Sequence, residues 1–303
     1  MADSDSIAET KPAQAETKPV NAALGPLNRV PSETDLLDVM EGDLRREVRV
    51  HEHGFVALVD AMPRLVPKGQ TADSAIVQAA RVSYGQGTKK VSEDRGLIRY
   101  LLRHRHTTPF EMVEFKFHIA MPIFVARQWK RHRTANVNEY SARYSILPDR
   151  FYRPSTDGVR KQSTANRQGG DIAFDIADSG EARTADDFLK LLDEVEALYP
   201  KYLELTERGV SRELARTALP VSMYTEWYWK CDLHNLLRFL SLRMDSHAQQ
   251  EIQDFAQAMH DLVKPIVPIT MDAWRDYDVG SIHRSRLEVD ALNDLAGGGE
   301  GHL

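Results

Sequence analysis

Residues 113–121 alternate strictly between two kinds of side chain. Apolar Val113, Phe115, Phe117, Ile119 and Met121 are separated by Glu114, Lys116, His118 and Ala120. Successive side chains of a strand point to opposite faces, so this pattern predicts a strand with one face in a core. Pro122 follows directly and can occupy the first position of a helix reaching about residue 131.

Most of the remaining pattern is helical. The spacing of apolar residues predicts helices over 74–82 (with Asp73 as N-cap), 92–104 (with Ser92 as N-cap), 184–209 (divided by Pro200), 211–220, and from about 232 to beyond 259. Residues 55–59 are apolar and partly β-branched, which favours a second strand. The glycines at 85 and 87 form only a fragment of a dinucleotide fingerprint, and no P-loop motif occurs. The sequence therefore predicts an α+β fold, a single domain with a small, mainly antiparallel sheet and several long helices, and not a Rossmann fold.

Both ends of the chain and one internal segment differ in composition from the rest. Residues 1–44 are rich in Ala, Pro, Glu, Thr and Lys and contain the string AETKP twice, which favours a disordered tail. Residues 286–303 include three consecutive glycines and suggest a flexible tail, and the polar segment 156–180 suggests a surface insertion. We expect one folded unit over 45–285.

Charge and cysteine usage exclude several classes of protein. Asp plus Glu is 45 and Lys plus Arg is 39, so a generally basic nucleic-acid binder is disfavoured. Cys231 is the single cysteine, which rules out an internal disulfide and any CxxC-type metal site. No apolar run of about 18 residues occurs, and the N-terminus lacks the apolar segment of a signal peptide. We therefore expect a cytoplasmic protein.

The stretch from Arg99 to Arg133 is strongly cationic. It holds eight Lys and Arg and two Glu, a charge of +6, which leaves −12 for the rest of a chain whose net charge is −6. Arg131, His132 and Arg133 close the expected helix, and guanidinium groups present planar donor forks to phosphates. A polar anionic ligand would suit this stretch, although a solvated cationic surface would have the same composition.

Two other groups invite a chemical interpretation. His104 and His106 have metal-ligand spacing, but no Asp or Cys completes a set and the flanking arginines would repel a cation, so no metal site is expected. Cys231 lies near Lys230 and His234 and could be a nucleophile, while a small buried thiol is the alternative.

Several blocks of the sequence together resemble one enzyme family. Arg131-His132-Arg133, followed after seven residues by Ser141, resembles the signature of flavin-dependent thymidylate synthases. The resemblance extends over five blocks in the family's order, which are AARVSY (79–84), HTTPFE (106–111), PIFVARQWKRHRTANVNEYSARYS (122–145), RELARTALP (212–220) and DLHNLLRFLSLRMDSHAQ (232–249).

The resemblance implies a specific reaction. Members of this family methylate dUMP reductively to dTMP, with methylenetetrahydrofolate as the one-carbon donor, FAD as the carrier and NADPH as the reductant. The resemblance also implies that no enzyme nucleophile takes part and that arginines polarise dUMP. The resemblance also implies a homotetramer in which several subunits contribute to each active site.

Site residues follow from the resemblance, position by position. The positions that match FAD contacts are Ser83, His106, Thr108, Arg131, His132, Arg133, Asp232, His234 and Arg238. The positions that match dUMP contacts are Gln128, Glu139, Ser141, Ala142, Arg143, Arg216 and Arg243. Arg216 is the catalytic candidate, because a fixed guanidinium near the uracil oxygens would stabilise developing enolate charge. Arg143 and Arg243 would neutralise the phosphate.

Other readings of the same residues remain open. One is a pyrimidine methyltransferase that uses Cys231 and no flavin. Another is a nucleic-acid-binding module with Arg103–Arg105 and Lys130–Arg133 as cations and Trp129 as the stacking residue. A structural helical scaffold is the third.

Overall fold

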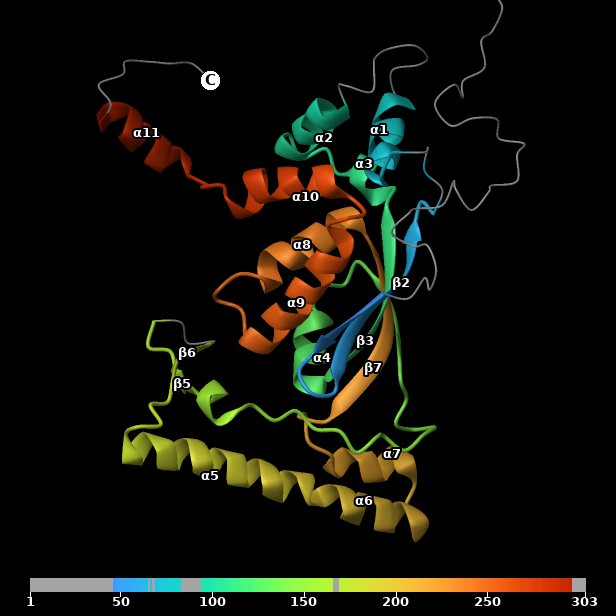
Figure 1. Cartoon of the computed structure of the whole chain (residues 1–303), viewed down its shortest axis with the longest axis vertical. Coiled ribbons are helices and arrows are strands. Elements are labelled where there is room, and N and C mark those ends of the chain that lie inside the picture. Colours follow the sequence, from blue (N-terminus) through green and yellow to red (C-terminus); the bar gives the residue numbers. More distant parts are fainter. Residues whose placement is uncertain (1–45, 65, 67–68, 83–93, 166–168, 296–303) are drawn as a thin grey trace, which may run out of the picture.

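The computed structural model describes residues 46–64, 66, 69–82, 94–165 and 169–295 (Figure 1). The expected N-terminal tail, the glycines at 85 and 87, and Ser92 lie outside these residues. No helix in the described parts is long and apolar enough to cross a lipid bilayer.

A five-stranded antiparallel sheet forms the centre of the molecule. Its order is β1 (Arg46–Val50), β2 (Gly54–Met62), β3 (Glu114–Pro122), β7 (Tyr224–Asp232) and β4 (Asn136–Glu139). The expected alternation is confirmed in β3, where Phe115, Phe117 and Ile119 are buried. Phe117 lies opposite Trp229, so both strands direct aromatic rings to the same face. This face of the sheet packs in the hydrophobic core.

Three helices cover this face of the sheet, namely α4 (Ile123–Trp129), α8 (Leu233–Arg243) and α9 (Gln250–Val263) (Figure 1). The Trp129 ring packs against Trp227, Trp229, Phe239 and Phe255 at centroid distances of 4.5–6.3 Å. This aromatic cluster joins α4, α8 and α9 to the sheet. The α+β class predicted from the sequence is therefore confirmed.

The remaining elements lie at the two ends of the sheet (Figure 1). One end carries α1 (Asp73–Arg81), α2 (Asp94–Arg103), α3 (Thr108–Glu111), α10 (Pro268–Trp274), the π-helical turn η7 (Arg275–Val279) and α11 (Arg286–Leu295). The other end carries η5 (Thr156–Gly158), the strand pair β5 (Arg160–Gln162) and β6 (Gly170–Ala173), α5 (Ser179–Glu196), α6 (Leu198–Glu207), α7 (Arg212–Ala215) and η6 (Arg216–Ala218).

The expected long helix from about 232 to beyond 259 is wrong, because α8 and α9 are separate helices. Between them, the Asp245 carboxylate accepts a hydrogen bond from the backbone N–H of His247 at 2.8 Å. An Asp side chain that bonds the backbone two residues on stabilises a turn, which competes with helix continuation. The chain therefore reverses over 244–249 and α9 packs back against α8.

Helix starts also differ from the expected ones. The helix expected from 184 begins at Ser179, because the Asp178 side chain caps it by accepting from the N–H groups of Gly180 and Glu181 at 2.9 and 3.0 Å. Pro200 does not mark the break itself. The chain divides at Ala197, and Pro200 lies in the first turn of α6, where a missing N–H removes no hydrogen bond.

The expected flexible tail from 286 contains α11 instead. Glu288 Oε2 accepts from the Ser285 N–H at 2.6 Å, and Ser285 Oγ accepts from the Glu288 N–H at 3.3 Å. This reciprocal pair is a capping box, which starts a helix at Arg286. The spacing Ser-x-x-Glu was present in the sequence and predicts this helix.

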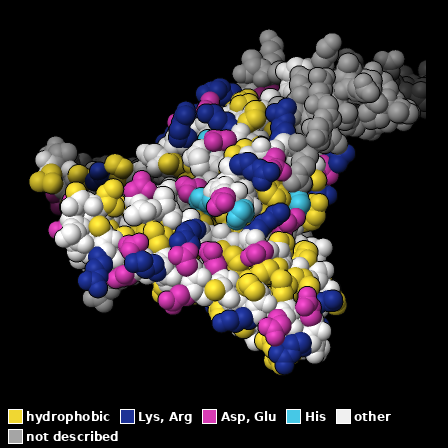
Figure 2. Space-filling model, turned by 60° about the horizontal axis from the view of Figure 1, so that its bottom comes forward, with side chains coloured by type: hydrophobic (Ala, Val, Ile, Leu, Met, Phe, Trp, Pro, Cys, Tyr) yellow, Lys and Arg dark blue, Asp and Glu magenta, His cyan; other side chains and the backbone are white. Residues whose placement is uncertain are grey.

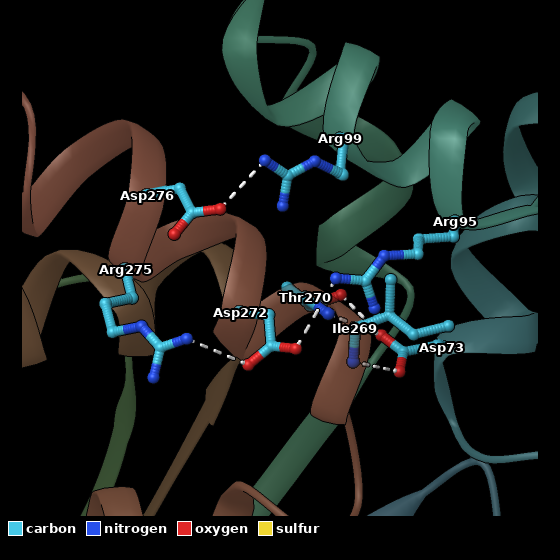
Figure 3. A network of polar contacts seen from close by, with 8 residues as sticks. All are labelled: Asp73, Arg95, Arg99, Ile269, Thr270, Asp272, Arg275 and Asp276. Carbon is cyan, nitrogen blue, oxygen red and sulfur yellow. Dashed lines mark hydrogen bonds and ion pairs between the residues drawn. The ribbon is translucent and has the colours of Figure 1, made fainter.

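Asp73 has a different role from the expected one. It is the first residue of α1, and its buried carboxylate accepts from Thr71 Oγ1 at 3.1 Å. It also accepts from the N–H groups of Ile269 and Thr270 and from Thr270 Oγ1 at 2.5–3.0 Å (Figure 3). Burial raises the pKa of this carboxyl, and the four donors act in the opposite direction. Asp73 thus caps α10 across the tertiary structure.

Candidate functional site

The C-terminal ends of α4 and α8 meet at a cluster of three residues. Arg243 Nε donates to His132 Nε2 at 3.0 Å, and Arg243 Nη2 donates to the backbone oxygen of Gln128 at 3.3 Å. The helix expected to reach about residue 131 is shorter, because α4 ends at Trp129. A turn follows, in which the His132 N–H donates to the backbone oxygen of Trp129. This turn brings His132 to α8, where its ring packs edge-on against Phe239. We call Gln128, His132 and Arg243 the α4–α8 cluster.

The electrostatics of this cluster are unusual for a protein surface. Burial, together with the positive charges of Arg243 and Arg238, lowers the pKa of His132 to about 4. His132 is therefore neutral at pH 7, and its Nε2 can accept from Arg243 only if the ring proton is on Nδ1. Burial also lowers the pKa of Arg243. Groups with strongly shifted pKa values cluster at functional sites, which makes this cluster a candidate site.

The His132 pKa makes a testable prediction about stability. Unfolded histidine binds a proton below about pH 6.5, whereas folded His132 stays neutral down to about pH 4, so the unfolded state takes up more protons in this window. We expect stability to fall between pH 6.5 and 4 by about 1 kcal/mol more in the wild type than in His132→Gln. The figure is well below the full linkage value because the ring is half exposed to solvent. Urea unfolding at several pH values measures this difference. An unfolding free energy that depends equally on pH in both proteins would contradict the lowered pKa of His132.

A second set of expected positions lies around the start of α8. The Leu233 N–H donates to the backbone oxygen of Val113 at 2.7 Å, which joins this helix start to the segment that follows α3. The Asp232 carboxylate caps α8 by accepting from the Asn235 N–H at 2.9 Å. α3 packs against α8, so the structure brings the expected positions His106, Thr108, Asp232 and His234 to one end of the sheet. Ser83 lies outside the described residues.

Three arginines among the expected FAD positions form no ion pair with a described carboxylate. Arg131, Arg133 and Arg238 are exposed, and no ion pair links them to a carboxylate in the parts of the chain that the structure describes. His106 stacks on Tyr100 at a centroid distance of 6.0 Å, and Tyr100 is also exposed. Exposed guanidiniums can bind an anionic group, and exposed rings can stack on an aromatic one.

A third set of expected positions lies where the loop after β4 meets α7. Ala142 and Ala215 belong to a separate small core with Tyr199 and Tyr202. Arg212 Nη1 donates to the backbone oxygen of Tyr144 at 3.1 Å, which fixes the loop against α7. We call this region, with Ser141, Ala142, Arg143 and Arg216, the α7 loop region. The Arg143 and Arg216 side chains in it are both exposed.

Glu139 is held at the edge of the sheet. Its Oε2 pairs with Lys130 Nζ at 2.5 Å, and its Oε1 accepts from Thr225 Oγ1 at 2.9 Å. The first contact ties the residue after α4 to β4, and the second ties β4 to β7. Glu139 therefore has a structural role in addition to any contact with a ligand.

The expected dUMP positions fall into two groups within one chain. Among the described residues, no hydrogen bond or ion pair joins the α4–α8 cluster to the α7 loop region. α7 lies beside α6 at one end of the molecule, away from α8 (Figure 1). The expected dUMP positions of one chain therefore lie in two separate regions.

Gln249 is a neighbour of this site that the sequence interpretation did not assign. Its Oε1 accepts from Gln128 Nε2, so it contacts the α4–α8 cluster directly. It also lines a cavity of about 890 Å³ between the β5–β6 segment, α5 and the start of α9, whose walls include the rings of Phe124, Tyr152, Phe174 and Phe188. The available signal was its position, since Gln249 is the last residue of a matching block.

Two alternative readings of the sequence conflict with the structure. Cys231 is 3% exposed on the core face of β7, and burial raises the pKa of its thiol well above the ordinary value, which opposes a nucleophilic role. Trp129 is completely buried in the aromatic cluster, so it cannot stack on bases. The face seen in Figure 2 shows Lys and Arg interspersed with Asp and Glu and not a continuous basic surface.

Comparison with known proteins gives consistent matches. The family model described as thymidylate synthase complementing protein (Thy1) matches residues 64–269. A flavin-dependent thymidylate synthase of Dictyostelium discoideum is 63% identical over 264 residues, covering 87% of this chain and 85% of the relative. One from Wolbachia pipientis wMel is 51% identical over 255 residues, covering 84% and 85%.

A solved structure is also similar. The crystal structure of the UMP/dUMP methylase PolB from Streptomyces cacaoi, bound with 5-Br UMP, superposes with a TM-score of 0.63 at 31% identity. The match covers 76% of this chain and 97% of that one. A second structure of the same methylase, bound with 5-Br dUMP, gives the same TM-score at 32% identity.

Proposed function

The chain belongs to the flavin-dependent thymidylate synthase family, and from this premise we propose that it methylates dUMP reductively to dTMP. In this proposal methylenetetrahydrofolate donates the one-carbon group, FAD carries it and NADPH supplies the reducing equivalents. The observation that supports it most is the α4–α8 cluster, in which a half-buried Arg243 and a neutral His132 lie next to the exposed Arg131 and Arg133.

The residues present fit a flavin dinucleotide. Arg131, Arg133 and Arg238 offer exposed guanidiniums for the pyrophosphate, and the exposed imidazole of His106 offers a ring surface beside Tyr100. We assign His132, Thr108, Asp232, His234 and Ser83 to the same cofactor as polar contacts. When bound, FAD supplies the redox and carrier chemistry, and the protein supplies binding and orientation.

We assign the nucleotide to the two arginine-bearing regions. Arg143 and Arg243 would neutralise the phosphate of dUMP, and Gln128, Glu139, Ser141 and the backbone at Ala142 would complete its contacts. Arg216 would stabilise the negative charge that develops on the uracil oxygens. Ser141 serves as a binding group in this proposal, because its Oγ accepts from the Arg143 N–H at 3.3 Å and no His is bonded to it among the described residues.

The separation of the two regions supports a shared active site. We propose a homotetramer in which the α4–α8 cluster of one subunit meets the α7 loop region of another. Large apolar side chains are exposed on α5, α6 and α7, which fits such an association. They are Phe188, Leu191, Leu198, Leu205 and Leu214. Hydrophobic patches between charged groups are visible in Figure 2.

Domain limits and location complete the proposal. We propose residues 45–285 as the catalytic unit, with 156–180 as an insertion that contains β5 and β6. A cytoplasmic location remains a prediction.

Cys231→Ala separates this proposal from a thiol mechanism. Because the thiol is buried with a raised pKa, we expect the variant to keep more than about half of the wild-type kcat, with a stability loss of about 1 kcal/mol from the small cavity. Steady-state turnover and thermal unfolding measure the two quantities. A folded, flavin-loaded variant without activity would revive the Cys231-dependent methyltransferase.

A visible absorption spectrum tests the proposed function itself. The purified protein, reconstituted with FAD if necessary, is mixed with NADPH in the absence of oxygen, with and without dUMP. We expect a flavin spectrum that bleaches faster when dUMP is present. A protein that cannot bind FAD would overturn the proposal, and a gel shift that weakens with salt would then favour the nucleic-acid reading.

A further inference from the structure

Two glutamine side chains join α4 to the start of α9. Gln128 is half-buried in the last turn of α4, and its Nε2 donates to Gln249 Oε1. The backbone oxygen of the same Gln128 accepts from Arg243 Nη2 at 3.3 Å. Gln249 is therefore linked to Arg243 through Gln128.

Gln249 occupies a position where its side chain would ordinarily serve the helix. It is the N-cap residue of α9, with φ −62° and ψ 137°, and its backbone oxygen accepts from the N–H groups of Ile252 and Gln253 at 3.1 Å. Its side chain makes no capping hydrogen bond. Ser, Thr, Asp and Asn are preferred at such positions because their short side chains reach the first N–H groups of the helix. A long amide here gives up that contact and reaches Gln128 instead.

An amide side chain has a donor end and an acceptor end. Because Gln249 accepts from Gln128 Nε2, the Gln128 amide is held with its NH₂ group toward α9. No described residue donates to Gln128 Oε1, so this is the end that can meet a ligand. Without Gln249, the amide could rotate by 180° and offer either end.

We propose that Gln249 is a positioning residue, which holds the Gln128 amide so that Oε1 faces the pyrimidine nucleotide as an acceptor. This inference rests on the proposed function, in which Gln128 contacts dUMP. The nucleotide group opposite Oε1 must be a hydrogen-bond donor. Two donors are available on dUMP, namely the ring N3–H and the 3′-hydroxyl of the sugar.

Three variants separate positioning from folding. Gln249→Ser removes the contact with Gln128 and supplies a preferred N-cap, so we expect the Kd for dUMP to rise about tenfold, or about 1.4 kcal/mol, while Tm is unchanged or higher. Gln249→Glu keeps a long acceptor and should bind dUMP within about threefold of the wild type. Gln250→Ser is the matched control, since Gln250 is exposed one residue later and bonds Asp254, and its Kd should not change.

Two nucleotides identify the donor. dCMP lacks the N3–H, and 2′,3′-dideoxyuridine monophosphate lacks the 3′-hydroxyl. Calorimetric titration of the FAD-loaded wild type and Gln249→Ser gives the penalty for each analogue relative to dUMP. We expect the penalty for one analogue to shrink about tenfold in Gln249→Ser and the penalty for the other to stay constant, and the affected analogue names the donor.

The possible failures are distinguishable. If the wild type binds dUMP and Gln249→Ser binds it equally well with unchanged analogue penalties, the positioning role is wrong and the proposed function stands. If Gln249→Ser weakens all three nucleotides equally, with a fall in Tm, the residue has only a structural role. If the FAD-loaded wild type does not bind dUMP, the proposed function fails and the inference fails with it.

Discussion

Arg216→Ala lowers kcat about 100- to 1000-fold and leaves FAD bound, if this guanidinium stabilises charge on the uracil oxygens. Removal of one such donor typically has an effect of this size, because the stabilised charge exists only in the transition state. The Arg216 side chain is exposed, and among the described residues its Nε donates to the backbone oxygen of Glu213 at 3.3 Å. Its loss should therefore leave α7 in place and affect substrate chemistry alone.

Single-turnover rates and the flavin content of the purified variant measure the two effects separately. Arg208→Ala is the matched control, since Arg208 is exposed at the end of α6 and pairs with Glu204 at 3.2 Å. We expect no change in kcat for this control. Simultaneous loss of FAD and activity in Arg216→Ala would assign Arg216 to assembly of the site. Full activity would move the polarising role to another group.

Asp73→Asn should lower the free energy of unfolding by about 3 kcal/mol, because a buried hydrogen-bond donor left without an acceptor costs about 1–3 kcal/mol. The carboxylate accepts four hydrogen bonds in a site that is almost inaccessible to solvent. In Asn an NH₂ group replaces one carboxylate oxygen, so some of the four donors lose their acceptor. The donors include the N–H groups of Ile269 and Thr270 in the first turn of α10, so this helix start loses its cap.

Urea unfolding monitored by tryptophan fluorescence measures the effect. Asp272→Asn is the control on the same helix, where a partly exposed carboxylate pairs with Arg95 at 3.7 Å and Arg275 at 3.5 Å (Figure 3). Exposed pairs contribute little, so the control should lose less than about 1 kcal/mol. Similar losses in both variants would show that Asp73 does not hold α10.

Local patterns determined much of the secondary structure. The alternation at 113–121 predicted β3 and its buried face, and the expected helix limit at 209 matches Gly209, which has φ +97° and follows the end of α6. Other local signals were present but were interpreted incorrectly. The capping box at Ser285 starts α11, and the Asp245 turn divides α8 from α9. These errors concern boundaries, where a single side chain outweighs the apolar periodicity.

The residue types of the candidate site were also evident in the sequence, since Arg131 to Arg133 and Arg143 form a cationic stretch of recognisable spacing. Their mutual placement was not evident. His132 and Arg243 are 111 residues apart, and their contact exists because α4 ends at Trp129 and α8 packs beside it. The low pKa of His132 follows from that contact and from burial, neither of which a linear pattern contains.

The sequence by itself determined the fold class, the family and the kinds of side chain available for an anionic ligand, because these depend on local periodicity and on residue identity. Only the tertiary structure decided that Asp73 caps a helix 196 residues away, that Gln249 contacts Gln128, and that the expected dUMP positions of one chain lie in two regions. The physical reason is that hydrogen bonds and burial act between neighbours in space. Pairing of elements distant in the chain is set by the packing of the whole core.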